Sequence, residues 1–206
     1  MNNLSLPSMI GTKLFTERAV TIYLPFVYGH PDEFTQYKMN RDIFQIVHSL
    51  IDEQSVQQNE RLDEMLGTYE IKTNERSVLS IAFSNYAIYY KAAHGLTIMK
   101  SLTFDTETGK SFKLRELFKP DSNYIDILSE KVKKQISARN VPVFEPFTTI
   151  RPDQDFYIAD KALVLYFQLY EITPYAYGFP IFPISVYELE NIIAEDGPLA
   201  KMATNT

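Results

Sequence analysis

The sequence predicts an α+β fold, with an antiparallel meander sheet, two main helices and a short C-terminal helix. Apolar residues recur at helical spacing over residues 40–54 and 121–136. Between these segments, residues 68–111 alternate apolar and polar side chains with a period of two, which is typical of half-buried strands. The chain has 206 residues, 45% of them hydrophobic and 22% charged, so it can bury a core of ordinary globular composition.

A strand and a helix are expected first. Residues 18–27 alternate apolar and polar positions, and Pro25 favours a sheet edge or the end of a strand. Residues 40–54 place their apolar side chains on one helical face, and Asn40 is the expected N-cap.

Four strand-like runs follow, at residues 68–73, 77–84, 86–92 and 96–104. The joints between the first three are short and polar, Asn74-Glu75 and Ser84-Asn85, and therefore predict an antiparallel meander. The next segment, "DTETGK", is expected to close a further hairpin, with Gly109 in the left-handed backbone region.

The C-terminal half predicts helix, loop, hairpin and helix in that order. Asp121 or Ser122 is expected to cap the helix over residues 121–136, and three prolines make residues 141–154 an irregular connection. Residues 155–172 read as strand, tight turn and long strand. The last helix is expected to begin at Ser185, with Glu188 completing a capping box.

Composition excludes several classes of function. The formal net charge of −6 repels phosphate backbones, so nucleic acid is not an expected partner, whereas a cationic protein would be attracted. The chain has no cysteine, which excludes disulfides, thiolate nucleophiles and zinc–thiolate sites. No stretch approaches the ~20 apolar residues of a membrane span. No signal-peptide pattern is visible either, which by itself favours the cytoplasm.

The strongest chemical candidate is the carboxylate pair Asp105 and Glu107. Two residues apart on a strand, these side chains would share a face and could hold a divalent metal in a hydrolase. The alternative is a polar hairpin turn rich in Asp, Thr and Gly. His30, His48 and His94 lack metal-cluster spacing and have no recognisable nucleophile. We therefore expect no catalytic residues, no bound metal and no cofactor.

The C-terminal region is rich in Tyr and Phe, and its aromatic side chains suggest a binding surface. Tyr175, Tyr177 and Phe179 are the candidate contact residues, because prolines stiffen the segment and Tyr offers a large area with a polar tip. The alternative is that these side chains pack against the final helix.

Two stretches resemble a bacterial family. Residues 92–118, "AAHGLTIMKSLTFDTETGKSFKLRELF", and residues 155–189, "DFYIADKALVLYFQLYEITPYAYGFPIFPISVYEL", are similar to the signatures of the DUF3298 family. In that family a DUF4163 region often comes first. The resemblance implies a DUF4163-like region over residues 1–91 and a DUF3298-like region over residues 92–206, packed as one compact unit.

The family includes the extracytoplasmic domain of the lysozyme-sensing anti-sigma factor of bacilli. It also includes the N-terminal part of a peptidoglycan deacetylase, whose chemistry belongs to a separate domain. The resemblance therefore implies a non-enzymatic, sensor-type binding module for a lysozyme-like or cell-wall-associated protein, located outside the membrane. A divalent-metal hydrolase that uses Asp105 and Glu107 is the alternative.

Overall fold

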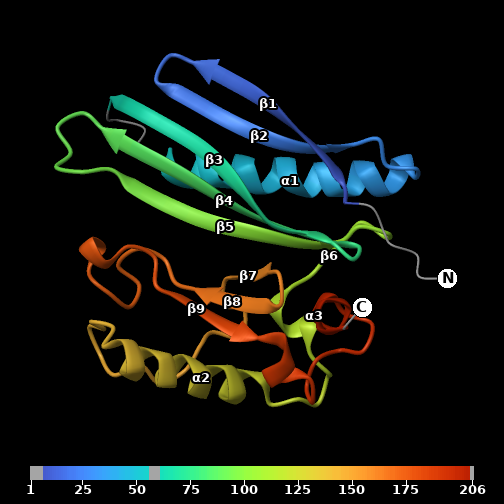
Figure 1. The fold of residues 1–206 in the computed structure, drawn as a ribbon. Helices are drawn as coiled ribbons and strands as arrows, with labels where there is room; N and C mark the ends of the chain where they lie inside the picture. Colours follow the sequence, from blue (N-terminus) through green and yellow to red (C-terminus); the bar gives the residue numbers. More distant parts are fainter. Residues whose placement is uncertain (1–6, 56–60, 205–206) are drawn as a thin grey trace. The chain divides into compact units, whose positions relative to one another are not determined.

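A computed structural model describes residues 7–55 and 61–204, and the chain forms two compact units, Met1–Ser111 and Phe112–Thr206 (Figure 1). Each unit has its own sheet and its own main helix. The predicted boundary between a DUF4163-like region (1–91) and a DUF3298-like region (92–206) is a boundary of family resemblance, and it stays a prediction. The expectation that the two regions pack as one compact unit also stays a prediction. No helix in the described ranges is both long and apolar enough to cross a bilayer.

The first unit is built on a six-stranded sheet in chain order. Its strands are β1 (Met9–Glu17), β2 (Val20–Tyr28), β3 (Leu62–Glu75), β4 (Val78–Tyr89), β5 (Leu96–Asp105) and β6 (Lys110–Ser111). The predicted antiparallel pairing is confirmed for β3–β4, β4–β5 and β5–β6. Strand β1, which was not predicted, also pairs antiparallel with β2, whereas β2–β3 is parallel over a short stretch. A parallel pair needs a crossover connection, and helix α1 (Glu33–Gln54) supplies it.

Helix α1 begins seven residues before the expected start. Asp32 is the N-cap, and its carboxylate accepts hydrogen bonds from the backbone N–H groups of Phe34 and Thr35. Asn40 as N-cap was therefore wrong, because it lies inside the helix. Its side chain instead accepts a hydrogen bond from the Val27 N–H (2.7 Å) and donates one to the Val27 carbonyl (2.8 Å).

The predicted turn at Ser84-Asn85 was also wrong, because residues 77–84 and 86–92 mostly form one continuous strand, β4. Asn85 is buried and its backbone carbonyl accepts a hydrogen bond from the Gln54 side chain (2.8 Å). The polar residues Ser84 and Asn85 thus lie where β4 contacts helix α1, and not at a turn. The β3–β4 turn lies at Arg76 and Ser77, both left-handed, rather than at Asn74-Glu75.

The core of the first unit lies between α1 and the sheet. It is made of apolar side chains from the helix and from strands β2, β4 and β5: Val27, Met39, Ile43, Leu50, Leu79, Ile81, Phe83 and Phe104. Because these positions alternate along the strands and recur every three or four residues along the helix, periodicity located the buried faces correctly.

The second unit contains a three-stranded antiparallel sheet in chain order, β7 (Phe156–Ala159), β8 (Ala162–Tyr166) and β9 (Ile181–Ser185). Helix α2 (Tyr124–Arg139) runs along this sheet and buries Leu128 and Val132 (Figure 1). The tight turn at Asp160 is confirmed, with a left-handed backbone. The long strand expected after it was wrong, because β8 ends at Tyr166 and residues 167–172 form no strand. Residues 141–154 carry no helix or strand, as expected.

Two expected helix starts in this unit were wrong. Helix α2 begins after Asn123, and the Ser122 hydroxyl donates to the Lys119 carbonyl instead of capping it. Residues 186–189 form only a 3-10 turn, in which Ser185 makes no capping bond and Glu188 pairs with Lys131. The short C-terminal helix is α3 (Pro198–Ala203), which starts with proline at a position where the missing N–H costs nothing.

Candidate binding surface

The aromatic run of the second unit divides into a buried set and an accessible set. Tyr166, Phe167 and Phe182 are at most 2% exposed and form part of the core. Tyr170, Tyr175, Tyr177 and Phe179 are not buried. We call these four side chains the aromatic surface. Because a Tyr or Phe in a well-packed core would be covered, their accessibility distinguishes them from their neighbours in sequence.

The backbone that carries the aromatic surface is bent and stiff. Tyr170 has a left-handed φ of 66°, and its ring lies 5.4 Å from the ring of Tyr175. A 3-10 turn, η2 (Tyr175–Tyr177), follows Pro174 and ends at Gly178, whose φ of 79° suits a residue without a Cβ. The segment then enters β9.

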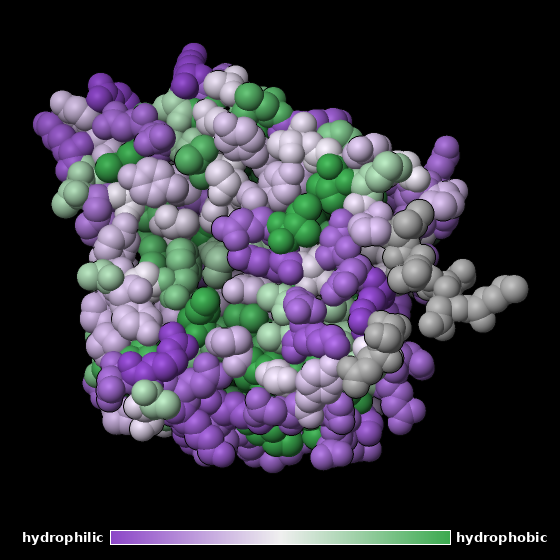
Figure 2. Space-filling model, viewed as in Figure 1, coloured by the Kyte–Doolittle hydropathy of each residue, from purple (hydrophilic) through white to green (hydrophobic). Residues whose placement is uncertain are grey.

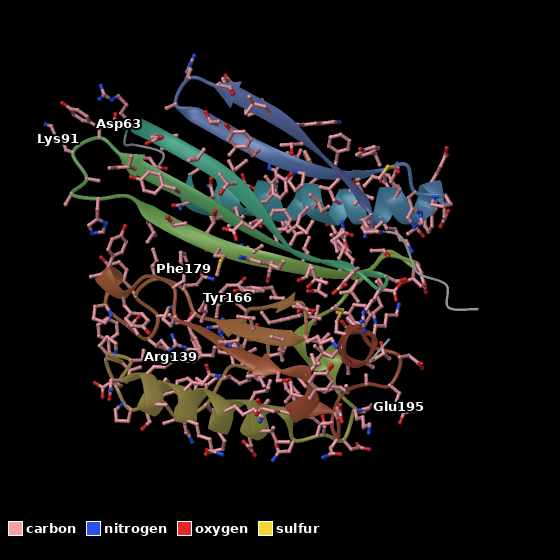
Figure 3. The ribbon with its side chains drawn as sticks, viewed as in Figure 1. Asp63, Lys91, Arg139, Tyr166, Phe179 and Glu195 are labelled. Atoms are coloured by element: carbon pink, nitrogen blue, oxygen red, sulfur yellow. The ribbon has the colours of Figure 1, made fainter. Side chains whose placement is uncertain are left out.

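Arg139, at the end of α2, fixes this segment to the sheet. Its Nη1 donates to the Ile181 carbonyl (2.7 Å) and its Nη2 to the hydroxyl of Tyr177 (3.3 Å). The guanidinium also lies 5.4 Å from the ring centre of Phe182. Figure 3 labels Arg139 on α2 and Phe179 on the segment that precedes β9. Sequence reasoning missed Arg139, because only its position at a helix end was visible.

A network of charged and polar side chains holds the bend that precedes the aromatic surface. Asp155 accepts hydrogen bonds from Gln168 (3.1 Å) and Arg151 (3.3 Å), and Arg151 also pairs with Glu171. The Glu171 carboxylate accepts from the Gln168 N–H (2.7 Å). Burial raises the pKa of Asp155 above its ordinary value, although both hydrogen-bond partners oppose the shift.

The carboxylates of Asp105 and Glu107 serve the β5–β6 hairpin separately. Asp105 accepts from the backbone N–H groups of Glu107 (2.9 Å) and Thr108 (3.0 Å), and Glu107 accepts from the Ser77 hydroxyl (2.8 Å). Gly109 takes the predicted left-handed conformation. Within residues 7–55 and 61–204, no three His, Asp or Glu side chains come together as a metal site would need. The metal-hydrolase alternative stays untested.

The three histidines lie apart and serve local structure. His94 hydrogen-bonds the carbonyl of Gly95 through Nδ1 (3.0 Å), as expected for a turn histidine. His30 contacts the Thr106 carbonyl through Nε2 (2.9 Å), which ties the β5–β6 hairpin to the start of α1. The ring of His48 lies 5.0 Å from that of Phe44 on the outer face of α1.

A second exposed aromatic row, which the sequence reasoning also missed, lies on helix α1. Phe34, Tyr37 and Phe44 point away from the core, and each is more than half exposed. Their spacing of three and seven residues puts them on one helical face. This row belongs to the other compact unit, so its residues provide matched controls for the aromatic surface.

Comparison with known proteins gives one family match and one curated relative. Residues 115–187 match the family described as "Protein of unknown function (DUF3298)". The chain is 31% identical over 137 residues to the anti-sigma-V factor RsiV of Bacillus subtilis (strain 168). The matched region covers 61% of this chain, which spans only 47% of that protein. The DUF3298 resemblance is confirmed, while the DUF4163-like region stays a prediction.

Two solved structures share the fold. A DUF3298 family member from Bacteroides fragilis NCTC 9343 aligns with a TM-score of 0.71 over 96% of this chain and 98% of its own. A DUF3298 family protein from Pseudomonas aeruginosa PAO1 aligns with a TM-score of 0.66 over 100% of this chain and 99% of its own. Both are 13% identical to this chain, so they show a common fold and no more.

Proposed function

From the match of residues 115–187 to the DUF3298 family, we propose that this chain is a non-enzymatic, sensor-type binding module that docks a protein on its aromatic surface. The observation that carries the proposal is the accessibility of Tyr175, Tyr177 and Phe179. All three lie inside the family region, beside aromatic residues that are buried. Kinship with an anti-sigma factor supports a regulatory rather than a catalytic role.

The aromatic surface has the physical properties of a contact site. Tyr and Phe offer large areas and few rotatable bonds, and Tyr keeps a polar tip that tolerates water at an interface. Pro174 restricts the backbone of the segment and Arg139 anchors it by hydrogen bonds, so less conformational entropy would be lost on binding. Such pre-ordered aromatic side chains commonly contribute most of the binding energy of an interface.

A cationic, lysozyme-like protein is the ligand we propose. The chain carries a formal net charge of −6, which speeds encounter with a basic partner at low ionic strength. The resemblance found in the sequence implies the same class of partner. Attraction between exposed charges weakens with salt, so affinity should fall between low and physiological ionic strength.

Titration calorimetry with a panel of lysozymes, at low and at physiological salt, tests the proposal. The wild-type chain should bind at least one of them, and Tyr177→Ala should weaken binding by more than about tenfold, as expected for a contact tyrosine. Phe44→Ala removes an aromatic side chain that is 54% exposed on the other unit, so this variant should bind as wild type. No heat and no melting shift with any lysozyme would remove the lysozyme proposal.

The stability of Tyr177→Ala separates a contact residue from a core residue. Truncation of a buried aromatic side chain costs about 3–5 kcal/mol. Tyr177 is only half-buried, so we expect a loss below about 2 kcal/mol. Tyr177→Phe keeps the ring and loses only the hydrogen bond from Arg139. If Tyr177→Ala instead lowers the unfolding free energy by about 3–5 kcal/mol, Tyr177 is a core residue and its assignment to the contact surface is wrong.

A further inference from the structure

Strand β1 forms one end of the six-stranded sheet, and its side chains are unusually accessible. In the described part of the chain no strand pairs with its outer edge (Figure 1). Leu14 is 60% exposed and Phe15 54%, although neighbouring residues of a strand point to opposite faces. Figure 2 shows apolar surface mixed with polar surface over the region of β1 and β2. The open edge of such a strand presents unpaired backbone N–H and carbonyl groups, to which a strand of another chain can pair.

The hydrogen-bonding direction of each β1 residue follows from its register with β2. Ile10 is paired with Val27, whose N–H and carbonyl point away from β1 and are bound by Asn40. Ile10 is therefore in a non-hydrogen-bonded pair, and its own polar groups point to the open edge. The direction of the backbone N–H and carbonyl groups alternates along a strand, so Thr12, Leu14 and Thr16 also present theirs to the open edge.

We propose that this edge binds a second copy of the chain, with the two β1 strands antiparallel and Phe15 facing Phe15 at the two-fold axis. Leu14 then lies opposite Thr16 of the second copy, and both have outward polar groups, so they can exchange backbone hydrogen bonds. Phe15 becomes a non-hydrogen-bonded pair, in which side chains approach most closely. The two rings can stack there.

Charge selects this register. With Phe15 at the axis, Lys13 of each copy lies opposite Glu17 of the other, on the same face as Phe15, so two opposite-charge pairs flank the aromatic pair. In the described part of the chain neither Lys13 nor Glu17 takes part in a salt bridge, although the Lys13 ammonium lies 5.2 Å from the Phe26 ring. Both charges remain available to a partner.

Three neighbouring registers also place residues with outward backbone polar groups opposite one another, but their charged side chains are less well matched. Centring on Lys13 places two ammonium groups opposite each other. Centring on Leu14 places Lys13 opposite Phe15, and centring on Thr16 places Phe15 opposite Glu17. Only the register centred on Phe15 satisfies both charges, and a self-complementary patch of this kind closes a two-fold dimer without extending into a fibre.

Charge reversal and sedimentation equilibrium test the interface. The wild-type chain should show a concentration-dependent dimer. Lys13→Glu or Glu17→Lys alone replaces two attractive pairs by two repulsive ones and should raise the dissociation constant by at least about tenfold. The double variant Lys13→Glu/Glu17→Lys restores opposite charges and should restore the dimer. Lys91→Glu, on the β4–β5 loop, should leave the dimer intact.

A wild-type chain that stays monomeric at the highest soluble concentration overturns the proposal. The proposal is also overturned if the dimer forms but Lys13→Glu or Glu17→Lys leaves its dissociation constant unchanged. If a single variant loses the dimer and the double variant does not restore it, the register centred on Phe15 is excluded. Circular dichroism of each variant confirms folding, so that an unfolded variant is not mistaken for a monomer.

Cysteine cross-linking tests the register independently, because the natural chain contains no cysteine. In Phe15→Cys the two Cα atoms would lie about 4.5 Å apart, within the range that a disulfide spans. Leu14→Cys is the matched control, because Leu14 faces Thr16 and not itself. Mild oxidation should link Phe15→Cys copies much faster than Leu14→Cys copies. Equal rates, or faster linking of Leu14→Cys, would overturn the proposed pairing.

Discussion

Asn40 illustrates how one side chain can join helix α1 to the sheet. Its amide accepts a hydrogen bond from the Val27 N–H and donates one to the Val27 carbonyl. Strand β3 pairs with β2 only over Val20–Ile22, so the ladder does not reach Val27. The Asn40 amide takes the place of the missing strand. Asn40→Ala should therefore leave both polar groups of Val27 without partners.

The cost follows from burial. Val27 is 1% exposed, and an unpaired buried polar group costs about 1–3 kcal/mol, so loss of both partners costs about 2–6 kcal/mol. Asn40 itself is only half-buried, and water can reach part of the space that the shortened side chain leaves. We therefore expect the lower part of this range, about 2–3 kcal/mol. That loss would lower the melting temperature by roughly 4–12 °C.

Urea unfolding followed by circular dichroism measures the effect, and two further variants separate a sheet contact from a helix cap. Asn40→Asp and Asn40→Ser both remain good capping residues, but neither carries an amide that can donate and accept at Val27. Both should stay destabilised. If either variant recovers wild-type stability, or if Asn40→Ala loses less than about 1 kcal/mol, the assigned role of Asn40 is refuted.

Two predictions concern the carboxylates. Burial raises the pKa of Asp155 in the folded chain, so the stability that this group contributes is complete below the ordinary aspartate pKa and is lost as pH rises through the raised value. The unfolding free energy of wild type relative to Asp155→Asn should therefore fall with rising pH in that window. Urea titrations across acidic pH would show this, and a difference that grows with pH would contradict it. Asp105→Ala should cost about 1 kcal/mol through the hairpin hydrogen bonds, equally with and without Mg²⁺ or Mn²⁺. If the two carboxylates held a metal, a metal concentration of a hundred times its Kd would instead raise the unfolding free energy of wild type by about 2.7 kcal/mol and leave that of Asp105→Ala unchanged.

Local chemistry in the sequence determined the parts of the fold that depend on nearby residues. The period of two located β2, β3, β4 and β5 but not β1 or β9, and helical spacing located the buried faces of α1 and α2. Gly109 and Asp160 marked real turns, because each takes the left-handed backbone conformation that such turns require. The family resemblance also rested on the order of residues alone, and residues 115–187 confirm it.

The tertiary structure decided what each polar or aromatic residue does. Asn40 and Asn85 look like caps and turns by composition, yet both lie inside regular elements. Each makes hydrogen bonds there with a partner that is distant in the chain. Likewise, neighbouring aromatics separate into core and surface only when β8, β9 and α2 come together. Side-chain burial and long-range hydrogen bonds depend on which elements meet, and that information is spread over the whole chain rather than carried by any short stretch.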